Sequence, residues 1–299
     1  MALAATRQQG QDGLEITMNY LITGATGDIG SRVVDRLLDL GDRPRVFVRD
    51  AEKARARFGD RVDIAVGDLA DAGSLIEALS GIDALLLVNI GPDLAARDER
   101  AAMVAKGAGV RLLVKLSSMD AQQGLATGAW HARGEAAIRA SGIGFTFVEP
   151  SGFMSNALGW AKSIKTDGVV RASTGDGRIA FIHPDDIAAV TTKALTTLPY
   201  AGKSLPITGP EALSYADMAA KIGAVIGKSL TFEPISDELA RQQLISGGAT
   251  EAETEAHVSL WRAIREGRVA AITDNVERVI GRKPILFARW AEQNGGAFL

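Results

Sequence analysis

Three glycines at three-residue intervals, Gly24, Gly27 and Gly30, follow directly on an apolar run at residues 20–22. A glycine-spaced turn of this kind reverses the chain sharply and lets backbone N–H groups approach a bound phosphate. A helix that begins within the turn adds its positive end to the same place. The spacing therefore predicts a site for the pyrophosphate of a dinucleotide. We expect this site to include Thr26, Asp28 and Ile29 as well.

A basic pair after the next apolar run bears on which dinucleotide would bind. Arg49 follows residues 46–48, where an acidic residue usually holds the ribose of NADH and a cation accommodates the 2′-phosphate of NADPH. Lys53 lies one helical turn further on and would assist, whereas Asp50 favours NADH. A surface arginine that only solvates a strand end is the alternative. The pattern favours NADPH over NADH.

Two later loops follow apolar runs and are expected to border the adenine, the ribose and the phosphates. Either loop could equally be a plain turn. The residues concerned are Gly67, Asp68 and Leu69 in the first loop, and Asn89 and Ile90 in the second.

Apolar runs of strand length alternate with helical patterns through the first half of the chain. Runs that are apolar almost throughout are typical of strands buried on both faces, and their alternation with helices predicts a parallel sheet. The sequence thus predicts an α/β fold with a doubly wound parallel Rossmann sheet. Besides the first run, the expected strands are residues 46–48, 62–66, 84–88, 112–116 and 145–148.

The regular alternation ends near Pro150 and predicts a smaller C-terminal α/β lobe that holds the substrate. Asp185 or Asp186 is expected to cap a helix that runs to Leu195, and Ser214 with Asp217 forms a variant of the capping box. The expected division is a loose extension at 1–17, a dinucleotide-binding domain at 18–155 and a substrate lobe mainly at 156–299. Residues 179–208 are expected to return to the main sheet.

Composition excludes several classes of function. The 299 residues carry 33 basic and 36 acidic side chains without a basic block, which argues against direct nucleic-acid binding. The absence of cysteine excludes disulfides and thiolate catalysis and suits the cytoplasm. The three histidines are scattered, so no metal site is expected. Residues 1–17 lack the apolar core of a signal peptide, and no run is long enough to span a membrane. The oligomeric state stays open.

Together, these segments resemble the NmrA-like branch of the atypical short-chain dehydrogenases, over residues 18–299. The resemblance implies a Rossmann domain, a smaller lobe and a substrate cleft between them above the nicotinamide. It assigns Pro150 to the cofactor site and implies reduction of quinones or other carbonyl and aromatic compounds. The family also includes regulators that bind a dinucleotide and turn nothing over. The motifs that carry the resemblance are the glycine turn, Val48-Arg49-Asp50, Gly67-Asp68-Leu69, Leu116-Ser117-Ser118, Glu149-Pro150, Gly152-Phe153-Met154 and Phe181-Ile182-His183-Pro184.

Short-chain dehydrogenases commonly use a tyrosine followed four residues later by a lysine, and this pair does not occur in the sequence. On the helix that would carry it, Thr127, His131 and Glu135 share one face. His131 would be the proton donor near neutral pH, with Glu135 orienting the ring or raising its pKa. A structural helix pair is the alternative. Ser117 and Ser118, at the end of the fifth strand, would contact the nicotinamide or the substrate or would simply cap a turn.

Because the tyrosine–lysine pair that would supply a strong acid is missing, the sequence favours a substrate whose reduced oxygen needs little help from a proton donor. Hydride addition to a quinone or an extended enone gives a delocalised oxyanion, so we expect a small planar aromatic or quinone-like substrate. The side chains expected to hold it are Trp130, Phe153, Met154 and Trp160, for which ordinary core positions are the alternative. The sequence favours an NADPH-dependent reductase; a catalytically silent NAD(P) sensor and, less favoured, a nucleotide-independent scaffold stay open.

Overall fold

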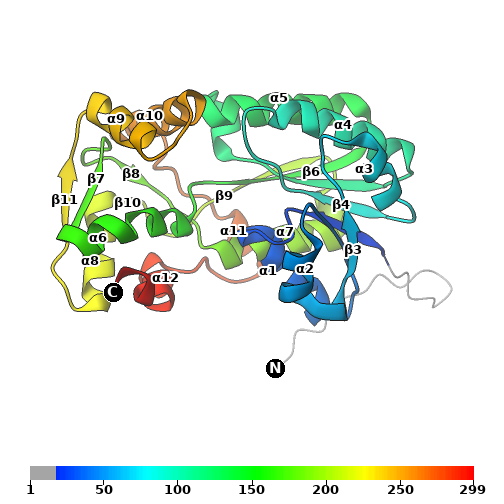
Figure 1. The fold of residues 1–299 in the computed structure, drawn as a ribbon, viewed down its shortest axis with the longest axis horizontal. Coiled ribbons are helices and arrows are strands. Elements are labelled where there is room, and N and C mark those ends of the chain that lie inside the picture. The colour runs from blue at the N-terminus through cyan, green and yellow to red at the C-terminus, as the bar shows by residue number, and fades with distance from the viewer. Residues whose placement is uncertain (1–17) are drawn as a thin grey trace.

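In the computed structural model, which describes residues 18–299, seven parallel strands form the central sheet in the order β3-β2-β1-β4-β5-β6-β9 (Figure 1). The chain runs outward from β1 to β3 and then returns to β4, so the order reverses between β1 and β4. The doubly wound fold is confirmed, while the predicted extension at 1–17 lies outside the described residues. The strands are β1 (Tyr20–Thr23), β2 (Arg45–Val48), β3 (Asp63–Val66), β4 (Ala84–Leu87), β5 (Leu112–Leu116), β6 (Gly144–Pro150) and β9 (Lys203–Ile207).

Helices cover both faces of this sheet (Figure 1). On one face lie α3 (Ala72–Ala78), α4 (Leu94–Gly107) and α5 (Ala126–Ser141); on the other lie α1 (Asp28–Asp39), α2 (Ala51–Phe58), α7 (Pro184–Thr196) and α11 (Asn275–Ile280). Helix α1 buries Ile29, Val33 and Leu37, the stripe that its four-residue spacing predicts. Burial on both faces explains why the inner strands β1, β4 and β5 are apolar almost throughout.

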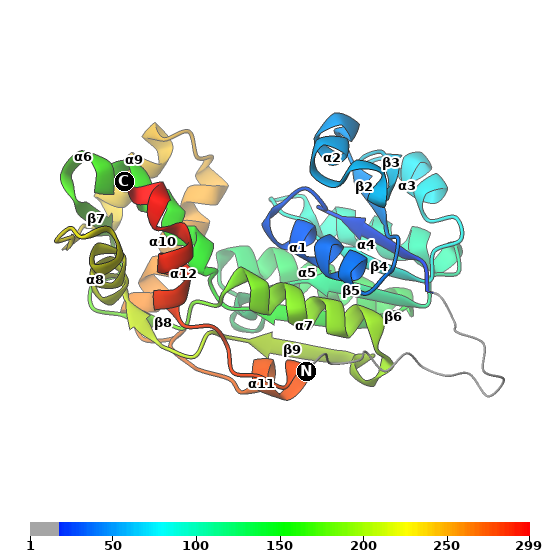
Figure 2. The ribbon, with the colours of Figure 1, turned by 90° about the horizontal axis from the view of Figure 1, so that it is seen from below.

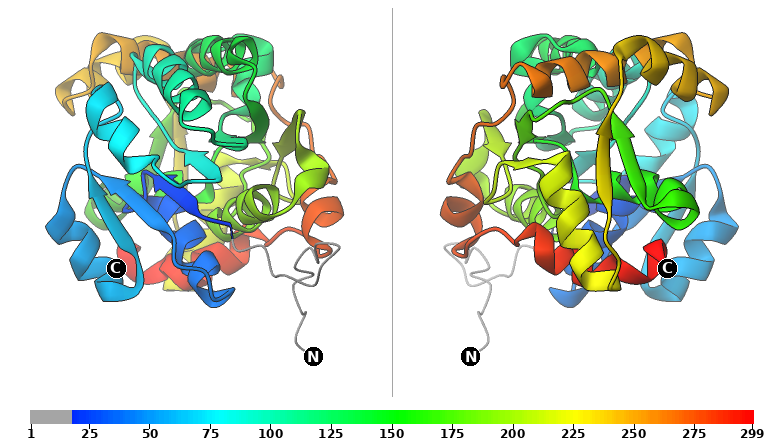
Figure 3. Two further views of the ribbon diagram at one scale, coloured as in Figure 1. Left: turned by 90° about the vertical axis from the view of Figure 1, so that its right-hand side faces the viewer. Right: turned by 90° about the vertical axis from the view of Figure 1, so that its left-hand side faces the viewer.

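A smaller lobe lies at one end of the sheet (Figure 2). It has a parallel pair, β7 (Val169–Ala172) with β11 (Thr231–Pro234), and an antiparallel pair, β8 (Arg178–Ile179) with β10 (Leu213–Ser214). Figure 3 shows β7 and β11 side by side. Around them lie α6 (Ala161–Asp167), α8 (Tyr215–Ile226), α9 (Asp237–Ser246), α10 (Glu251–Arg265) and α12 (Phe287–Asn294). The lobe has its own apolar core, which contains Tyr215, Phe287 and Trp290.

The chain crosses between the two parts more than once. In the sequence, α7 and β9 come after β7 and β8 of the smaller lobe. Nevertheless, α7 packs against α1, and β9 pairs with β6 at the edge of the central sheet. Short 3-10 helices complete the connections, at η1 (Gly59–Arg61), η2 (Met119–Gln123), η3 (Met154–Trp160), η4 (Leu198–Tyr200) and η5 (Gly295–Phe298). None of the helices within residues 18–299 is both long and apolar enough to cross a membrane.

One predicted helix cap is wrong and another is confirmed. The N-cap of α7 is His183, whose Nδ1 accepts a hydrogen bond from the backbone N–H of Asp185 at 3.0 Å. Asp185 and Asp186 instead lie inside the first turn, because Pro184 takes the first helical position, which it suits since it lacks an N–H. Ser214 and Asp217 form the reciprocal capping box that their spacing predicts.

Candidate functional site

The turn between β1 and α1 requires glycine at two positions. Gly24 has φ of +61°, and a Cβ there would lie 2.9 Å from the side chain of Val88. A Cβ at Gly30 would lie 2.2 Å from the carbonyl oxygen of Gly24, so the helix reaches the turn only without a side chain. Gly27 is the N-cap of α1, and no side chain of residues 18–299 caps that helix. Its first-turn N–H groups are therefore left for an anion.

A pocket of about 660 Å³ extends from this turn along the carboxyl ends of the central strands. It lies where the strand order reverses, the usual ligand position in open α/β sheets. The structure brings to it every predicted cofactor residue except Pro150, together with one predicted catalytic and one predicted substrate residue. These are Gly24, Thr26, Gly27, Asp28, Ile29, Gly30, Arg49, Lys53, Gly67, Asp68, Leu69, Asn89, Ile90 and Ser117, with His131 and Phe153.

The pocket end beside β2 carries two basic side chains. Arg49 and Lys53 are exposed, and neither side chain has a hydrogen bond or ion pair with another described residue. Asp50, which would favour a ribose hydroxyl, instead caps α2 by accepting a hydrogen bond from the backbone N–H of Lys53 at 3.0 Å. The two cations are thus free for a ligand, and the competing carboxylate is engaged.

The opposite end is formed by Ser117 after β5, His131 on α5 and Phe153 before η3. His131 Nδ1 is buried and has no hydrogen-bond partner in the described part of the chain. Burial, with the positive charge of Lys115, lowers the pKa of His131 to about 3. The ring is therefore neutral near pH 7. The expectation that Glu135 raises the pKa of His131 is wrong, because Glu135 accepts a hydrogen bond from the Ser117 hydroxyl.

Behind this end lies a buried ion pair that the sequence analysis missed. Lys115 Nζ is 2.6 Å from Asp98 Oδ2, and both side chains are fully buried. Asn89 donates to Asp98 Oδ1 at 3.1 Å, which connects the pair to the pocket lining. A Cβ at Gly134 would lie 2.2 Å from Asp98 Oδ2, so this glycine lets α5 close over the carboxylate. The available signal was a lysine inside an otherwise apolar strand.

With this geometry established, comparison with known proteins identifies the family. A family model described as NAD(P)H-binding matches residues 24–197, which include the glycine turn, both cations and the opposite end of the pocket. The chain belongs to this NAD(P)H-binding family. The pocket fits that cofactor, since the glycine turn leaves the first N–H groups of α1 uncapped for a pyrophosphate.

Two relatives of this NAD(P)H-binding chain are reductases. A (4-alkanoyl-5-oxo-2,5-dihydrofuran-3-yl)methyl phosphate reductase from Streptomyces griseus is 37% identical, and an NAD(P)H azoreductase from Xenophilus azovorans is 35% identical; each match covers 93% of this chain and 98% of the relative. A solved structure of an Escherichia coli NADPH-dependent quinone oxidoreductase in complex with NADPH has a TM-score of 0.84 at 24% identity. That match covers 92% of this chain and 99% of the other. The resemblance to the NmrA-like branch is confirmed.

Several predicted site residues do not line the pocket. Met154 is fully buried in the core of the smaller lobe, and the Trp160 ring packs 4.9 Å from the ring of Tyr215 there. These two side chains serve the lobe instead of a substrate, because their segment turns into it directly after Phe153. The other predicted site residues outside the pocket lining are Trp130 and Thr127 on α5, Pro150 at the end of β6, and Ser118. The Ser118 hydroxyl caps η2 by accepting a hydrogen bond from the backbone N–H of Asp120.

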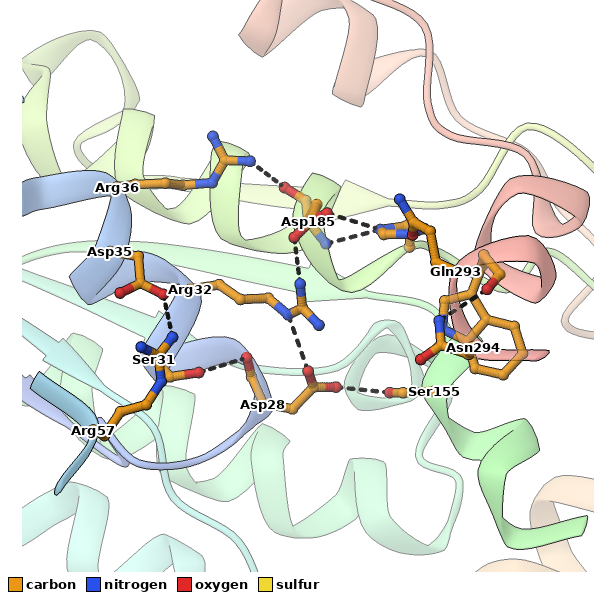
Figure 4. Close-up of polar contacts among 12 residues, drawn as sticks. Asp28, Ser31, Arg32, Asp35, Arg36, Arg57, Ser155, Asp185, Gln293 and Asn294 are labelled. Atoms are coloured by element: carbon orange, nitrogen blue, oxygen red, sulfur yellow. Dashed lines mark hydrogen bonds and ion pairs between the residues drawn. The ribbon is translucent and has the colours of Figure 1, made fainter. Parts of the chain in front are cut away.

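Polar contacts join helix α1 to the rest of the molecule (Figure 4). Asp28, which lines the pocket, accepts hydrogen bonds from Ser155 of η3 at 2.8 Å and from Arg32 at 3.1 Å. Arg32 also contacts Asp185 of α7 at 2.5 Å. The opposing arginine offsets the negative charge of Asp28, which otherwise lies close to the expected phosphates. The first turn of α1 thus contacts the segment that follows Phe153.

Proposed function

We propose that this protein is an NADPH-dependent reductase that transfers hydride to a quinone-like or conjugated carbonyl aromatic compound. The observation that carries the proposal is the asymmetry of the pocket, with the unpaired cations Arg49 and Lys53 at one end and Ser117, His131 and Phe153 at the other. Because a dinucleotide has its pyrophosphate at the middle, adenosine at Arg49 and Lys53 puts the nicotinamide beside Ser117, His131 and Phe153. The reductases among its relatives support the same class of reaction.

The cofactor preference rests on Arg49 and Lys53. Hydrogen bonds to a charged group contribute about 1.5–3 kcal/mol, so we expect Arg49→Ala to weaken NADPH binding by about 10- to 100-fold and NADH binding by about threefold or less. Titration calorimetry with both cofactors measures this difference. Arg55→Ala is the control, since Arg55 is an exposed arginine on α2, the helix that follows Arg49, and it pairs with Glu52 outside the pocket. Equal losses for NADPH and NADH would remove Arg49 from 2′-phosphate recognition.

Bound NADPH would supply the hydride. The chain would orient its ring between Ser117 and His131 and shield it from water with Phe153. His131, neutral near pH 7, offers one N–H hydrogen bond to a developing oxyanion but no imidazolium proton. A substrate whose added charge spreads over a conjugated system needs no more than this, and its proton comes from solvent. Uptake of one hydride and one proton converts a quinone to a hydroquinone.

Turnover with a panel of quinones, azo compounds and isolated ketones tests the reaction. We expect steady cofactor oxidation with the conjugated acceptors and at least tenfold slower turnover with isolated ketones, which need a stronger acid. Tight NADPH binding without turnover of any acceptor would instead indicate a cofactor sensor. The test includes Ser117→Ala, which removes a hydroxyl at the nicotinamide end but leaves Arg49 and the glycine turn unchanged.

A further inference from the structure

The hydroxyl of Ser117 is committed to a partner away from the pocket. It donates a hydrogen bond to Oε1 of Glu135 at 2.5 Å, and both residues are at least 95% buried. The other oxygen of Glu135 accepts from Arg139 at 3.3 Å. The ammonium group of Lys115 adds a second positive charge near this carboxylate. Both carboxylate oxygens of Glu135 therefore accept hydrogen bonds, one from Ser117 and one from Arg139.

This arrangement fixes what Ser117 can offer to a ligand. A serine hydroxyl has one proton and two lone pairs. Since the proton is used by Glu135, only lone pairs of Oγ remain for the pocket that Ser117 lines. A ligand at this point must then be a hydrogen-bond donor. The carboxamide NH₂ is the hydrogen-bond donor that a nicotinamide ring carries.

We propose that Glu135 is a positioning residue that makes Ser117 an obligate acceptor, and that Ser117 in this state recognises the carboxamide NH₂ of the nicotinamide. The inference rests on the proposed function, since it assumes the nicotinamide lies at this end of the pocket. It also makes Ser117, not His131, the functional partner of Glu135, although Glu135 and His131 share one face of α5. Ser117 is then no proton donor to the substrate.

Replacing Glu135 by glutamine should invert the polarity of Ser117. Arg139 offers only donors, so it should attract the amide oxygen of the new side chain. The amide NH₂ would then donate to Ser117 Oγ and release the hydroxyl proton toward the pocket. Ser117 would change from an acceptor into a donor while the volume of the buried side chain stays nearly the same.

An analogue of NADP⁺ in which a 3-acetylpyridine ring replaces nicotinamide is the probe. It keeps the carbonyl oxygen and replaces the NH₂ group by a methyl group. We expect the wild-type protein to bind NADP⁺ about tenfold more tightly than the analogue, since one hydrogen bond of about 1.4 kcal/mol is lost. In Glu135→Gln and in Ser117→Ala this ratio should fall to about one. Titration calorimetry gives all the dissociation constants without turnover.

Glu149→Gln is the control for loss of a neighbouring buried carboxylate, because Glu149 accepts a hydrogen bond from Gln122 and has none with Ser117 in the described part of the chain. Its ratio should stay at the wild-type value. In the double variant Ser117→Ala with Glu135→Gln, the second change should have no further effect on the ratio, whereas a merely structural role of Glu135 would act in both backgrounds. The Ser117→Ala result stands on its own should the Glu135 variant fail to fold.

Three results would overturn the inference. Equal wild-type affinity for the two ligands would show that no carboxamide donor is recognised. An unchanged ratio in Ser117→Ala, with both ligands weakened equally, would place Ser117 against the ribose instead. An unchanged ratio in a folded Glu135→Gln protein would separate Glu135 from recognition. Failure of the proposed function is distinguishable, because the wild-type protein would then bind neither ligand or would bind NADP⁺ without any turnover of NADPH.

Discussion

Removing the charge of Lys115 tests how much the buried ion pair contributes to the fold beneath the pocket. Lys115→Met keeps the stem of the side chain and leaves the Asp98 carboxylate fully buried, with only the Asn89 amide as a hydrogen-bond partner. Breaking one partner of a buried pair costs about 3–5 kcal/mol. Total stabilities of about 5–15 kcal/mol make this a large fraction of the free energy of unfolding.

A second calculation gives a similar loss of unfolding free energy for Lys115→Met. The variant can avoid a buried charge by protonating the carboxyl group, which at pH 7 costs about 4 kcal/mol, because an ordinary aspartic acid has a pKa near 3.9 and each pH unit is worth about 1.36 kcal/mol. This cost decreases with pH. A carboxyl that is protonated in the folded variant favours folding below its ordinary pKa and loses that advantage as pH rises. The loss of unfolding free energy in Lys115→Met, relative to the wild-type protein, should therefore decrease to about 1.5 kcal/mol at pH 5.

Urea unfolding, followed by tryptophan fluorescence at pH 5 and pH 7, measures both values. Adding Asp98→Asn to Lys115→Met should restore most of the loss at pH 7, since no buried charge then remains. Arg289→Met is the control, because it breaks the exposed pair with Glu292 and should cost less than about 1 kcal/mol. A loss at pH 7 no larger than that of the control, or a double variant no more stable than the single one, would refute the reasoning.

Three further predictions concern the pocket. The neutral ring of His131 stabilises the fold fully above pH 6.5 and loses this contribution as pH falls toward about 3, so His131→Gln should flatten the acid side of the stability curve by up to about 1.4 kcal/mol per pH unit, measured by urea unfolding. Gly30→Ala should abolish calorimetric NADPH binding, whereas Gly107→Ala, whose Cβ meets nothing within 4 Å, should bind normally and gain up to about 1 kcal/mol of stability. Ser155→Ala removes a hydroxyl that donates a hydrogen bond to Asp28 in the first turn of α1, and it should weaken NADPH binding by about three- to tenfold with a nearly constant thermal midpoint. An unchanged affinity would separate this contact from cofactor binding.

The dinucleotide turn was predictable because its determinants are local. The glycines, the apolar run before them and the helix stripe after them all lie within a short stretch, and each has a direct steric meaning. Arg49 and Asn89 were equally accessible, since parallel strands carry whatever follows them to one edge of the sheet. Sequence order alone is enough to place such residues.

The partners of the buried side chains were not predictable in this way. Lys115 and Asp98 meet from a strand and a helix, and only their three-dimensional packing makes them a pair. Met154 is apolar like Phe153, but residue type does not reveal which of two apolar cores a side chain joins. The four-residue spacing of His131 and Glu135 was real, yet the carboxylate turns toward the end of β5 because Ser117 offers a donor there.

The buried charges also explain why the pocket end at Ser117 and His131 has no strong acid. Burial of the ring, with the positive charge of Lys115, lowers the pKa of His131 and keeps it neutral, while Glu135 takes the only proton of Ser117. Both side chains that face the expected nicotinamide are thereby uncharged and limited to hydrogen bonding near pH 7. A site of this kind gives little help to the localised alkoxide of an isolated ketone but is sufficient for an acceptor that delocalises its own charge. Substrate selectivity would then follow from what the buried cation and carboxylates prevent these two residues from doing.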